Sequence, residues 1–326
     1  MQTWEKTHKN EVRVGVLLFD GFSNHCLANA VEPLRAANTL GRNNHYAWEY
    51  LTLTGAPAVS SSGLRIVPNA PLRQARGALL LVMPSYGVRD FATEPVMRGI
   101  RSAADRFEIM AGLDMGSWLL AKAGLLKGLR ATIHWDELTA FAEAFPDVSV
   151  VRERFVVAGN RITCSGAMAS FDLILHLMAQ SHGAALALEV EQLFMARGVS
   201  NTMPAGSGRL RLSRAAVAVM QENLETPLSM PDVARHMRCS QRKLEQTVRA
   251  DFGTTPQQLY KGLRLNFARR LAETTDLPLA EVALRSGYRD ASAMTRAFRQ
   301  HFGQTAGRAR RSADLANQSR SLIISP

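Results

Sequence analysis

Cysteine is scarce in this sequence, and no long apolar run is present. The 326 residues include three cysteines, Cys26, Cys164 and Cys239, an odd number without the close spacing of metal-binding pairs. This usage favours a reducing compartment, the cytoplasm. No apolar run reaches the roughly 20 residues that cross a bilayer, and the polar opening MQTWEKTHKN does not resemble a signal peptide. We therefore expect no metal ion, no cofactor and no membrane partner.

Acidic residues are outnumbered in the last third of the chain, where the excess positive charge concentrates. Residues 209–326 carry 20 Lys and Arg against 10 Asp and Glu, whereas residues 1–208 carry 19 against 18. A strongly basic segment attached to a near-neutral one is the charge pattern of a domain that binds a phosphate backbone. The alternative is a basic surface that serves only solubility.

The last third also contains an internal repeat. LSMPDVARHMRCSQRKLEQTVRADFGTTP, from residue 228, matches LPLAEVALRSGYRDASAMTRAFRQHFGQTA, from residue 277, with an offset of 49 before the central turn and 50 after it. Each copy predicts a short helix, a turn and a longer helix capped by Ser240 or Asp290. This is the helix-turn-helix pattern, whose second helix enters the major groove of DNA. A pair of generic helical hairpins is the alternative, which the charge disfavours.

Between the two copies, TTPQQLYKGLRLNFARRLAETTD predicts one long helix, with Thr255 as its cap and Pro256 at its first position. Residues 209–311 as a whole resemble the DNA-binding domain of the AraC/XylS family, two helix-turn-helix units joined by a linker helix. RLNFARRLAETTDLPLAEVALRSGYRDASAMTRAFRQHFGQTAGRAR carries the resemblance, and Ala306 departs from the family's usual Pro. The resemblance implies double-stranded DNA and RNA polymerase as partners, and a homodimer.

The two expected recognition helices differ in chemistry. The first exposes Gln and Arg, which can make bidentate contacts to adenine and guanine edges, whereas the second begins with Ala and Ser. We therefore expect the first helix to read more of the sequence and the second to contribute more to positioning. The candidate DNA-binding residues are Ser240, Gln241, Arg242, Lys243, Gln246, Arg249, Ala291, Ser292, Thr295, Arg296 and Arg299.

The first two thirds of the chain contain apolar strands that run into small-residue turns. VRVGVLLFDGF, ALLLVMPSYG and RFEIMAGLDMG alternate with helical segments, which predicts an α/β domain with a mostly parallel sheet covered on both faces. Ligands of such sheets bind at the carboxyl ends of the strands, so the turns 19–22, 84–87 and 112–116 should meet at one site. In the last turn, Asp114 occupies the strand-to-helix corner where many α/β enzymes hold a nucleophile.

About residues 11–195 resemble the ThiJ/PfpI, or class I glutamine amidotransferase-like, superfamily, which implies a flavodoxin-like sheet. AGLDMGSWLLAKAGLLKGLRATIHW carries the match, supported by VEPLRAAN and ITCSGAMASFDLILHLMAQ. Joined to an AraC-type domain, this region resembles the GlxA-like regulators over almost the whole chain. Enzymes of the superfamily place a Cys at the corner, helped by an acid from the first helix. In this sequence the corner is Asp114, and the helix acid matches Glu32.

We therefore interpret this domain as a former active site kept as a sensor, with no catalytic residue. An aspartate cannot repeat thiolate chemistry, and the residue after it is Met115 rather than His. The function that follows is a sequence-specific DNA-binding transcriptional regulator, expected to be an activator, that senses a small molecule. The alternative is a DNA-tethered amidase or hydratase of the same superfamily.

Charge indicates what such a sensor would bind. Asp114 facing Glu32 would place two carboxylates in one cleft, where a cation relieves their repulsion, and Trp135 could offer it an aromatic face. The corner Asp also resembles the subgroup that responds to arginine, glycine betaine or carnitine. The alternatives are that Asp114 only accepts N–H bonds from its turn, and that His134 and Trp135 only pack in the core. The candidate ligand-binding residues are Phe22, Glu32, Ser85, Tyr86, Gly87, Asp114, Met115, His134, Trp135, Cys164 and Ser165.

The expected organisation is thus an α/β domain with a mostly parallel, flavodoxin-like sheet, followed by an all-α domain with two helix-turn-helix units. The sensing domain covers residues 11–195 and the DNA-binding domain residues 209–311. Between them, residues 196–208 are rich in Gly, Ser and other polar residues and predict a linker. Residues 312–326 have no periodic pattern and predict a disordered tail.

Overall fold

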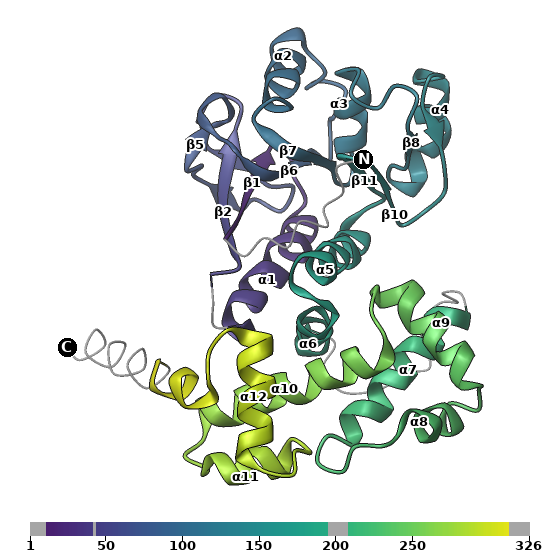
Figure 1. The fold of residues 1–326 in the computed structure, drawn as a ribbon. Coiled ribbons are helices and arrows are strands. Elements are labelled where there is room, and N and C mark those ends of the chain that lie inside the picture. Colours follow the sequence, from purple (N-terminus) through teal and green to yellow (C-terminus); the bar gives the residue numbers. More distant parts are fainter. Residues whose placement is uncertain (1–10, 42–43, 195–207, 313–326) are drawn as a thin grey trace, which may run out of the picture. The chain divides into compact units, whose positions relative to one another are not determined.

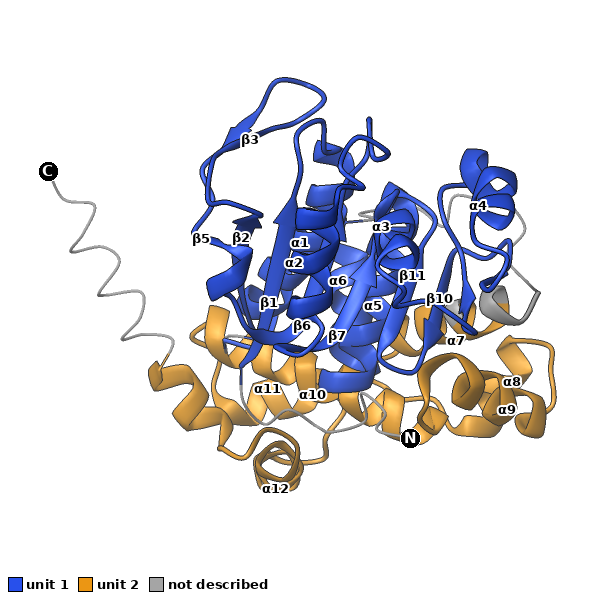
Figure 2. Ribbon diagram, turned by 90° about the horizontal axis from the view of Figure 1, so that it is seen from above, with its two compact units in different colours: residues 1–196 blue, residues 197–326 orange. Residues whose placement is uncertain are grey.

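A computed structural model describes residues 11–41, 44–194 and 208–312 (Figure 1). The contacts divide the chain into two units, residues 1–196 and residues 197–326 (Figure 2). The expected linker at 196–208 and the expected tail at 312–326 lie outside the described residues, apart from residues 208 and 312.

The first unit is built on a seven-stranded sheet with the strand order β10-β11-β7-β6-β1-β2-β5. Neighbouring strands run parallel, except for the antiparallel pair of β10 and β11. This confirms the mostly parallel sheet. The strands are β1 (Val12–Leu18), β2 (Tyr46–Thr52), β5 (Ala70–Pro71), β6 (Gly77–Met83), β7 (Phe107–Gly112), β10 (Phe155–Ala158) and β11 (Arg161–Cys164).

Helices cover both faces of this sheet. In Figure 1, α2 and α3 lie above the sheet, and α1, α5 and α6 lie below it. Alternate side chains of β1 reach the two sides, as strand geometry requires. Val14 and Val16 belong to the core formed with α1, α5 and α6, and Leu17 belongs to the core formed with α2, α3 and α4. The helices are α1 (Asn24–Gly41), α2 (Glu94–Ala103), α3 (Gly116–Lys122), α4 (Leu138–Ala144), α5 (Ala167–His182) and α6 (Ala184–Phe194).

The first unit also contains short strands and 3-10 helices that do not belong to the seven-stranded sheet. Two small two-stranded sheets pair β3 with β4 and β8 with β9. They and the single-turn 3-10 helices are β3 (Ala58–Val59), β4 (Arg65–Ile66), η1 (Leu72–Gln74), β8 (Arg130–Ala131), η2 (Trp135–Glu137) and β9 (Ser149–Val150). No helix in the described ranges has the length and apolar character needed to span a membrane.

The second unit contains the two expected helix-turn-helix copies on either side of a long helix. Thr255 caps that helix through a reciprocal capping box with Gln258, and Pro256 stands in its first turn, as predicted. The helix ends at Thr274, so Thr275 and Asp276, the last two residues of the predicted segment, lie outside it. The helices are α7 (Gly208–Glu222), α8 (Met230–His236), α9 (Gln241–Phe252), α10 (Pro256–Thr274), α11 (Leu279–Arg285) and α12 (Ala291–Phe302).

The second helix of each copy, α9 or α12, starts and stops on local signals. The Ser240 side chain accepts a hydrogen bond from the Lys243 amide, and the Asp290 carboxylate accepts one from the Ala293 amide at 2.7 Å, which confirms both expected caps. Both helices end at a glycine in the left-handed conformation, Gly253 and Gly303. Because α12 ends before residue 306, the unusual Ala306 does not affect where that helix stops.

Candidate ligand site and nucleic-acid interface

The corner between β7 and α3 is held in a strained, close-packed conformation. Asp114 has a φ of +56°, a left-handed value that it shares with Arg238 alone among the non-glycine residues the structure describes. Such a position costs on the order of 1–3 kcal/mol, although Asp tolerates it better than most residues. A Cβ on Gly116 would lie 2.0 Å from the Val82 carbonyl oxygen, and one on Gly112 would lie 2.6 Å from the Ser117 amide. The two glycines therefore let the backbone pack closely enough to form the corner.

The expected meeting of the turns is realised through a short chain of hydrogen bonds. The hydroxyl of Ser85, after β6, donates to Asp114 Oδ2 at 2.6 Å. The same hydroxyl oxygen accepts from the amide of Ser23, after β1, at 3.1 Å. A backbone bond from Met115 N to the Pro84 carbonyl adds a second link. The carboxylate of Asp114 thus lies where the turns after β1, β6 and β7 converge.

The two carboxylates that the sequence led us to pair have different surroundings. Glu32 forms an ion pair of 2.6 Å with Arg35, one turn further along α1, and its side chain is 45% exposed. It stands eight residues into α1, about 12 Å along the axis from the end that faces the strand edge. Its approach to Asp114 stays a prediction.

Cys26, in the first turn of α1, lies near enough to the corner for the charge of Asp114 to act on its thiol. Its thiol is buried, and burial raises its pKa far above the usual range, with the charge of Asp114 adding to the effect. Helix rise predicts this placement from the sequence. The first turn of a helix that follows a parallel strand lies beside the carboxyl ends of the strands.

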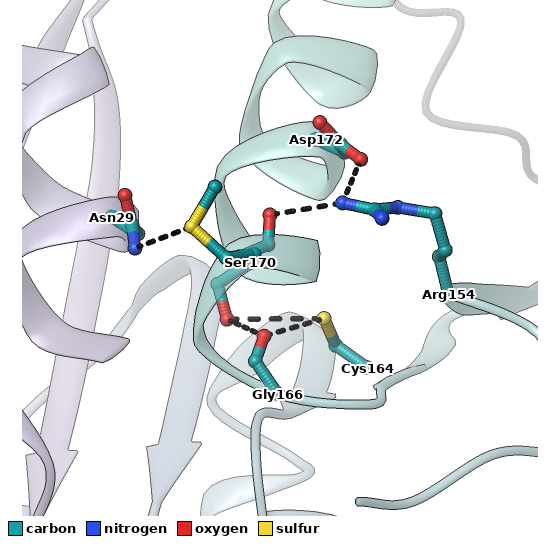
Figure 3. A network of polar contacts seen from close by, with 7 residues as sticks. Asn29, Arg154, Cys164, Gly166, Ser170 and Asp172 are labelled. Atoms are coloured by element: carbon teal, nitrogen blue, oxygen red, sulfur yellow. Dashed lines mark hydrogen bonds and ion pairs between the residues drawn. The ribbon is translucent and has the colours of Figure 1, made fainter. Parts of the chain in front are cut away.

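A second cysteine, Cys164, lies on the other side of one hydroxyl, that of Ser170, and Figure 3 shows Cys164 with Ser170 and Gly166. The oxygen of Ser170, on α5, lies 3.3 Å from the sulfur of Cys26 and 3.8 Å from that of Cys164, and it donates to the Gly166 carbonyl. Burial raises the pKa of Cys164 to about 11. Because the thiolate is the reactive form, the raised pKa values disfavour both thiols as nucleophiles. Both side chains are buried in the core of the first unit.

Two of the aromatic candidate side chains are exposed. Tyr86, next to Ser85, is 71% exposed, and Trp135 is 66% exposed. The alternative that Trp135 serves core packing is therefore wrong. His134 stacks against it with 5.6 Å between ring centroids, and the Cβ position of Gly166 lies 3.4 Å from the His134 ring.

The remaining candidate ligand residues support the backbone of the site. Phe22 is fully buried, and its backbone pairs with Ser60 next to the β3–β4 hairpin. Met115 is also buried, Gly87 adopts a left-handed turn conformation, and the Ser165 amide donates to the Arg154 carbonyl. Sequence reasoning missed Asn24, whose amide nitrogen donates to the Ser62 hydroxyl at the tip of that hairpin. Its position as a polar residue at the start of α1 was the signal in the sequence that could have indicated this contact.

The structure exposes the predicted reading surfaces of both recognition helices. On α9, the polar and basic candidates face solvent, while Leu244 and Val248 are buried. On α12, Met294 and Phe298 are buried, and a surface hollow is lined by Ala291, Ser292, Thr295 and Arg296. Ser240 uses its side-chain oxygen for the cap, so its expected base contact must compete with that bond.

Comparison with known proteins assigns both units. Residues 12–180 match the DJ-1/PfpI family, and residues 233–312 match a helix-turn-helix domain family. The chain is 35% identical to the HTH-type transcriptional regulator CdhR of Pseudomonas aeruginosa, over 88% of each chain. It is 32% identical to the HTH-type transcriptional regulator GlxA of Rhizobium meliloti, over 93% of this chain and 97% of that one.

Among solved structures, an AraC family transcriptional regulator from Pseudomonas putida matches with a TM-score of 0.51 at 26% identity, over 56% of this chain and 99% of that one. Together with the two basic reading helices, these matches define a DNA-binding transcriptional regulator. The chain belongs to the DJ-1/PfpI family, here joined to an AraC-type helix-turn-helix domain. Both resemblances found in the sequence are confirmed.

Proposed function

We propose that the DJ-1/PfpI unit binds a small cationic metabolite at the Asp114 corner and thereby controls transcription by the DNA-binding unit. The observation that carries the proposal is the placement of Asp114, a carboxylate held in a strained backbone position and oriented by Ser85. Proteins keep such strain mainly at functional sites. The exposed rings of Tyr86 and Trp135 add aromatic faces that suit a quaternary ammonium or guanidinium group.

The remaining parts of the proposal follow from the family resemblance. The regulator acts as an activator, as a homodimer in the cytoplasm, and contacts RNA polymerase at its operator. Arginine, glycine betaine and carnitine are the first effectors to try. A catalytic role for the same corner, as an amidase or hydratase, is disfavoured because Cys26 and Cys164 are buried and protonated.

The test combines a thermal-shift screen of the full chain against cationic metabolites with calorimetric titration of each compound that raises the melting temperature. Asp114→Asn keeps the size of the side chain and removes its charge. We expect it to weaken binding by about 1–3 kcal/mol, the scale of a charge-assisted hydrogen bond, while DNA binding is retained. Asp105→Asn removes an exposed carboxylate elsewhere in the unit and serves as the control.

Equal effector affinities for wild type and Asp114→Asn would reduce Asp114 to a structural turn residue and remove the main support for a cationic ligand. Conversion of an amide or nitrile-type substrate by the full chain would instead favour the enzymatic alternative. Asp114→Cys should show no such turnover, because Met115 stands where a supporting His would be needed.

A further inference from the structure

The second helix-turn-helix copy packs against the loop that leads from α7 into the first copy, beside the linker helix α10. Gly287, in the turn between α11 and α12, packs against the loop of residues 223–228 between α7 and α8. A Cβ on Gly287 would lie 2.4 Å from the Leu224 carbonyl oxygen and 2.4 Å from Pro227 Cγ, and its φ of +75° favours glycine. Only a residue without a side chain lets the turn of the second copy approach the backbone of this loop, which enters the first copy, so closely.

Two side chains of α10, one helical turn apart, reinforce this contact from either side. The hydroxyl of Tyr260 donates to the Asn223 carbonyl at 2.6 Å and accepts from the Leu228 amide at 3.3 Å. Arg264 donates to the carbonyls of Ser286 and Gly287, the first at 2.9 Å. Tyr260 therefore binds both ends of the loop 223–228, and Arg264 binds the turn of the second copy.

The guanidinium of Arg264 also lies over the ring of Tyr288, 4.4 Å from its centroid. We call the loop 223–228, the turn residues Ser286 and Gly287, Tyr260 and Arg264 together the seam; Tyr288 flanks it. Each polar bond across the seam ends on a backbone atom, so the seam holds the chain path itself rather than a movable side chain.

We propose that the seam sets the distance and relative orientation of α9 and α12, and thereby the number of base pairs between the two boxes of the operator. Helix α10 has 19 residues, about 28 Å of length, which is close to the roughly 34 Å between successive major grooves on one face of DNA. Length alone does not fix orientation, because α10 joins the copies through the short non-helical segments 253–255 and 275–278. The seam adds a second, non-covalent connection beside α10 and thereby restricts the relative orientation of α9 and α12.

This inference goes beyond effector sensing and rests on the DNA-binding function together with a two-box operator. One inserted base pair moves the second box by about 3.4 Å and rotates it by roughly 35° around the helix axis. A rigid pair of reading helices rejects that change, whereas a loosened pair follows it. Spacing preference is therefore a readout that a general loss of stability does not move.

The structure offers two matched controls. Tyr288 also carries a buried hydroxyl, but this one has no hydrogen-bond partner among the described residues. Both Tyr260→Phe and Tyr288→Phe remove one hydroxyl group. Only Tyr260→Phe thereby removes hydrogen bonds of the seam. Arg270 also lies on α10, and its guanidinium lies over Phe267 of the same helix, 5.1 Å from the ring centroid. Arg270→Lys therefore matches Arg264→Lys, and both keep the charge that attracts phosphates while Arg264→Lys loses the paired donors.

The experiment uses the full chain and a duplex operator selected by the wild-type protein from a random-sequence pool. Versions with one base pair added or removed between the boxes are then titrated by fluorescence anisotropy. For wild type and both controls we expect the altered spacing to cost at least about tenfold in affinity. For Tyr260→Phe and Arg264→Lys we expect that ratio to fall to about threefold or less, with melting of each variant confirming the fold.

A ratio in Tyr260→Phe and Arg264→Lys that stays at the wild-type value overturns the proposal, as does an equal fall in the two controls. A wild-type protein that ignores spacing overturns it as well, but through failure of the two-box operator. Effector binding is measured separately at Asp114, so failure of the proposed effector leaves this result unaffected. Gly287→Ala, which forces the turn away from Leu224, should give the largest loss of spacing preference if it folds.

Discussion

Single side chains decide what the DJ-1/PfpI unit can do at its strand edge. The corner keeps the tight geometry of a nucleophile's turn, with Gly112 and Gly116 packed against neighbouring backbone, but it presents a carboxylate. The thiols of Cys26 and Cys164 are buried among apolar residues, where burial keeps them protonated. Strain, charge and a hydroxyl partner are present at Asp114, and the proposed function assigns these properties to ligand binding.

A second residue-scale consequence concerns His176, on α5. Its ring packs against Phe155 at 5.2 Å between centroids, and burial lowers its pKa from 6.5. The unfolded chain therefore takes up a proton more readily than the folded chain. The free energy of unfolding should fall as the pH drops below about 6.5, and His176→Gln should make this fall shallower.

The measurement is urea unfolding of the full chain between pH 7.5 and about pH 5, followed by tryptophan fluorescence. All four tryptophans, at positions 4, 48, 118 and 135, belong to the first unit, so the signal reports on that unit. His25 is exposed, and His25→Gln is the control. The same pH dependence in wild type and His176→Gln would contradict the expectation.

At the scale of elements, the two recognition helices share one frame and differ in what they present. Helices α9 and α12 begin at a side-chain cap, end at a left-handed glycine and bury the same stripe. Their exposed first turns differ, with Gln241, Arg242 and Lys243 on α9 and Ala291 and Ser292 on α12. The frame positions both helices, and the exposed residues determine how much sequence each one reads.

This difference predicts two kinds of loss. Arg242→Ala should cost about 1–3 kcal/mol on the selected operator and relax the preference at one base position. Arg299→Ala, near the end of α12, should weaken binding to all DNA about equally and lower the salt dependence. Titrations of operator, single-base variants and random duplex at two salt concentrations distinguish them. Uniform losses for both variants would show that α9 is not the main reader.

At the scale of the whole molecule, the charge division assigns the tasks. Residues 209–326 hold twice as many basic as acidic residues, and residues 1–208 are almost balanced. Attraction to the phosphate backbone therefore comes from the DNA-binding unit, and the proposed function leaves selection of a small ligand to the near-neutral unit. Two reading helices held by one linker predict an operator of two directly repeated boxes rather than a short palindrome for each chain.

Inserting about five base pairs, half a turn of the double helix, between those boxes turns the second box to the opposite face of the duplex. Binding of the full chain should then fall to the level of a single box, as measured by anisotropy. A duplex with a full turn inserted is the companion measurement, because it restores the face but not the distance. Unchanged affinity after the half-turn insertion would contradict the two-groove arrangement.

Much of the fold could be predicted because its signals are local. Strand, corner and helix around Asp114 follow from consecutive residues, and the caps at Ser240, Thr255 and Asp290 act within three residues of themselves. The internal repeat indicated the two copies directly. The pairing of Asp114 with Glu32 came from the family resemblance and stays a prediction, whereas the electrostatic effect of Asp114 on Cys26 depends on packing that the sequence did not reveal.

The sequence by itself determined the order of the elements, the parallel sheet, the repeated reading helices and the separation of charge, since each depends on periodicity, capping or composition. Only the tertiary structure decided which distant residues meet. Ser85 reaches Asp114 across 29 residues, and Tyr260 reaches Asn223 across 37. Such contacts depend on how strands and helices pack in three dimensions, and no spacing along the chain encodes them.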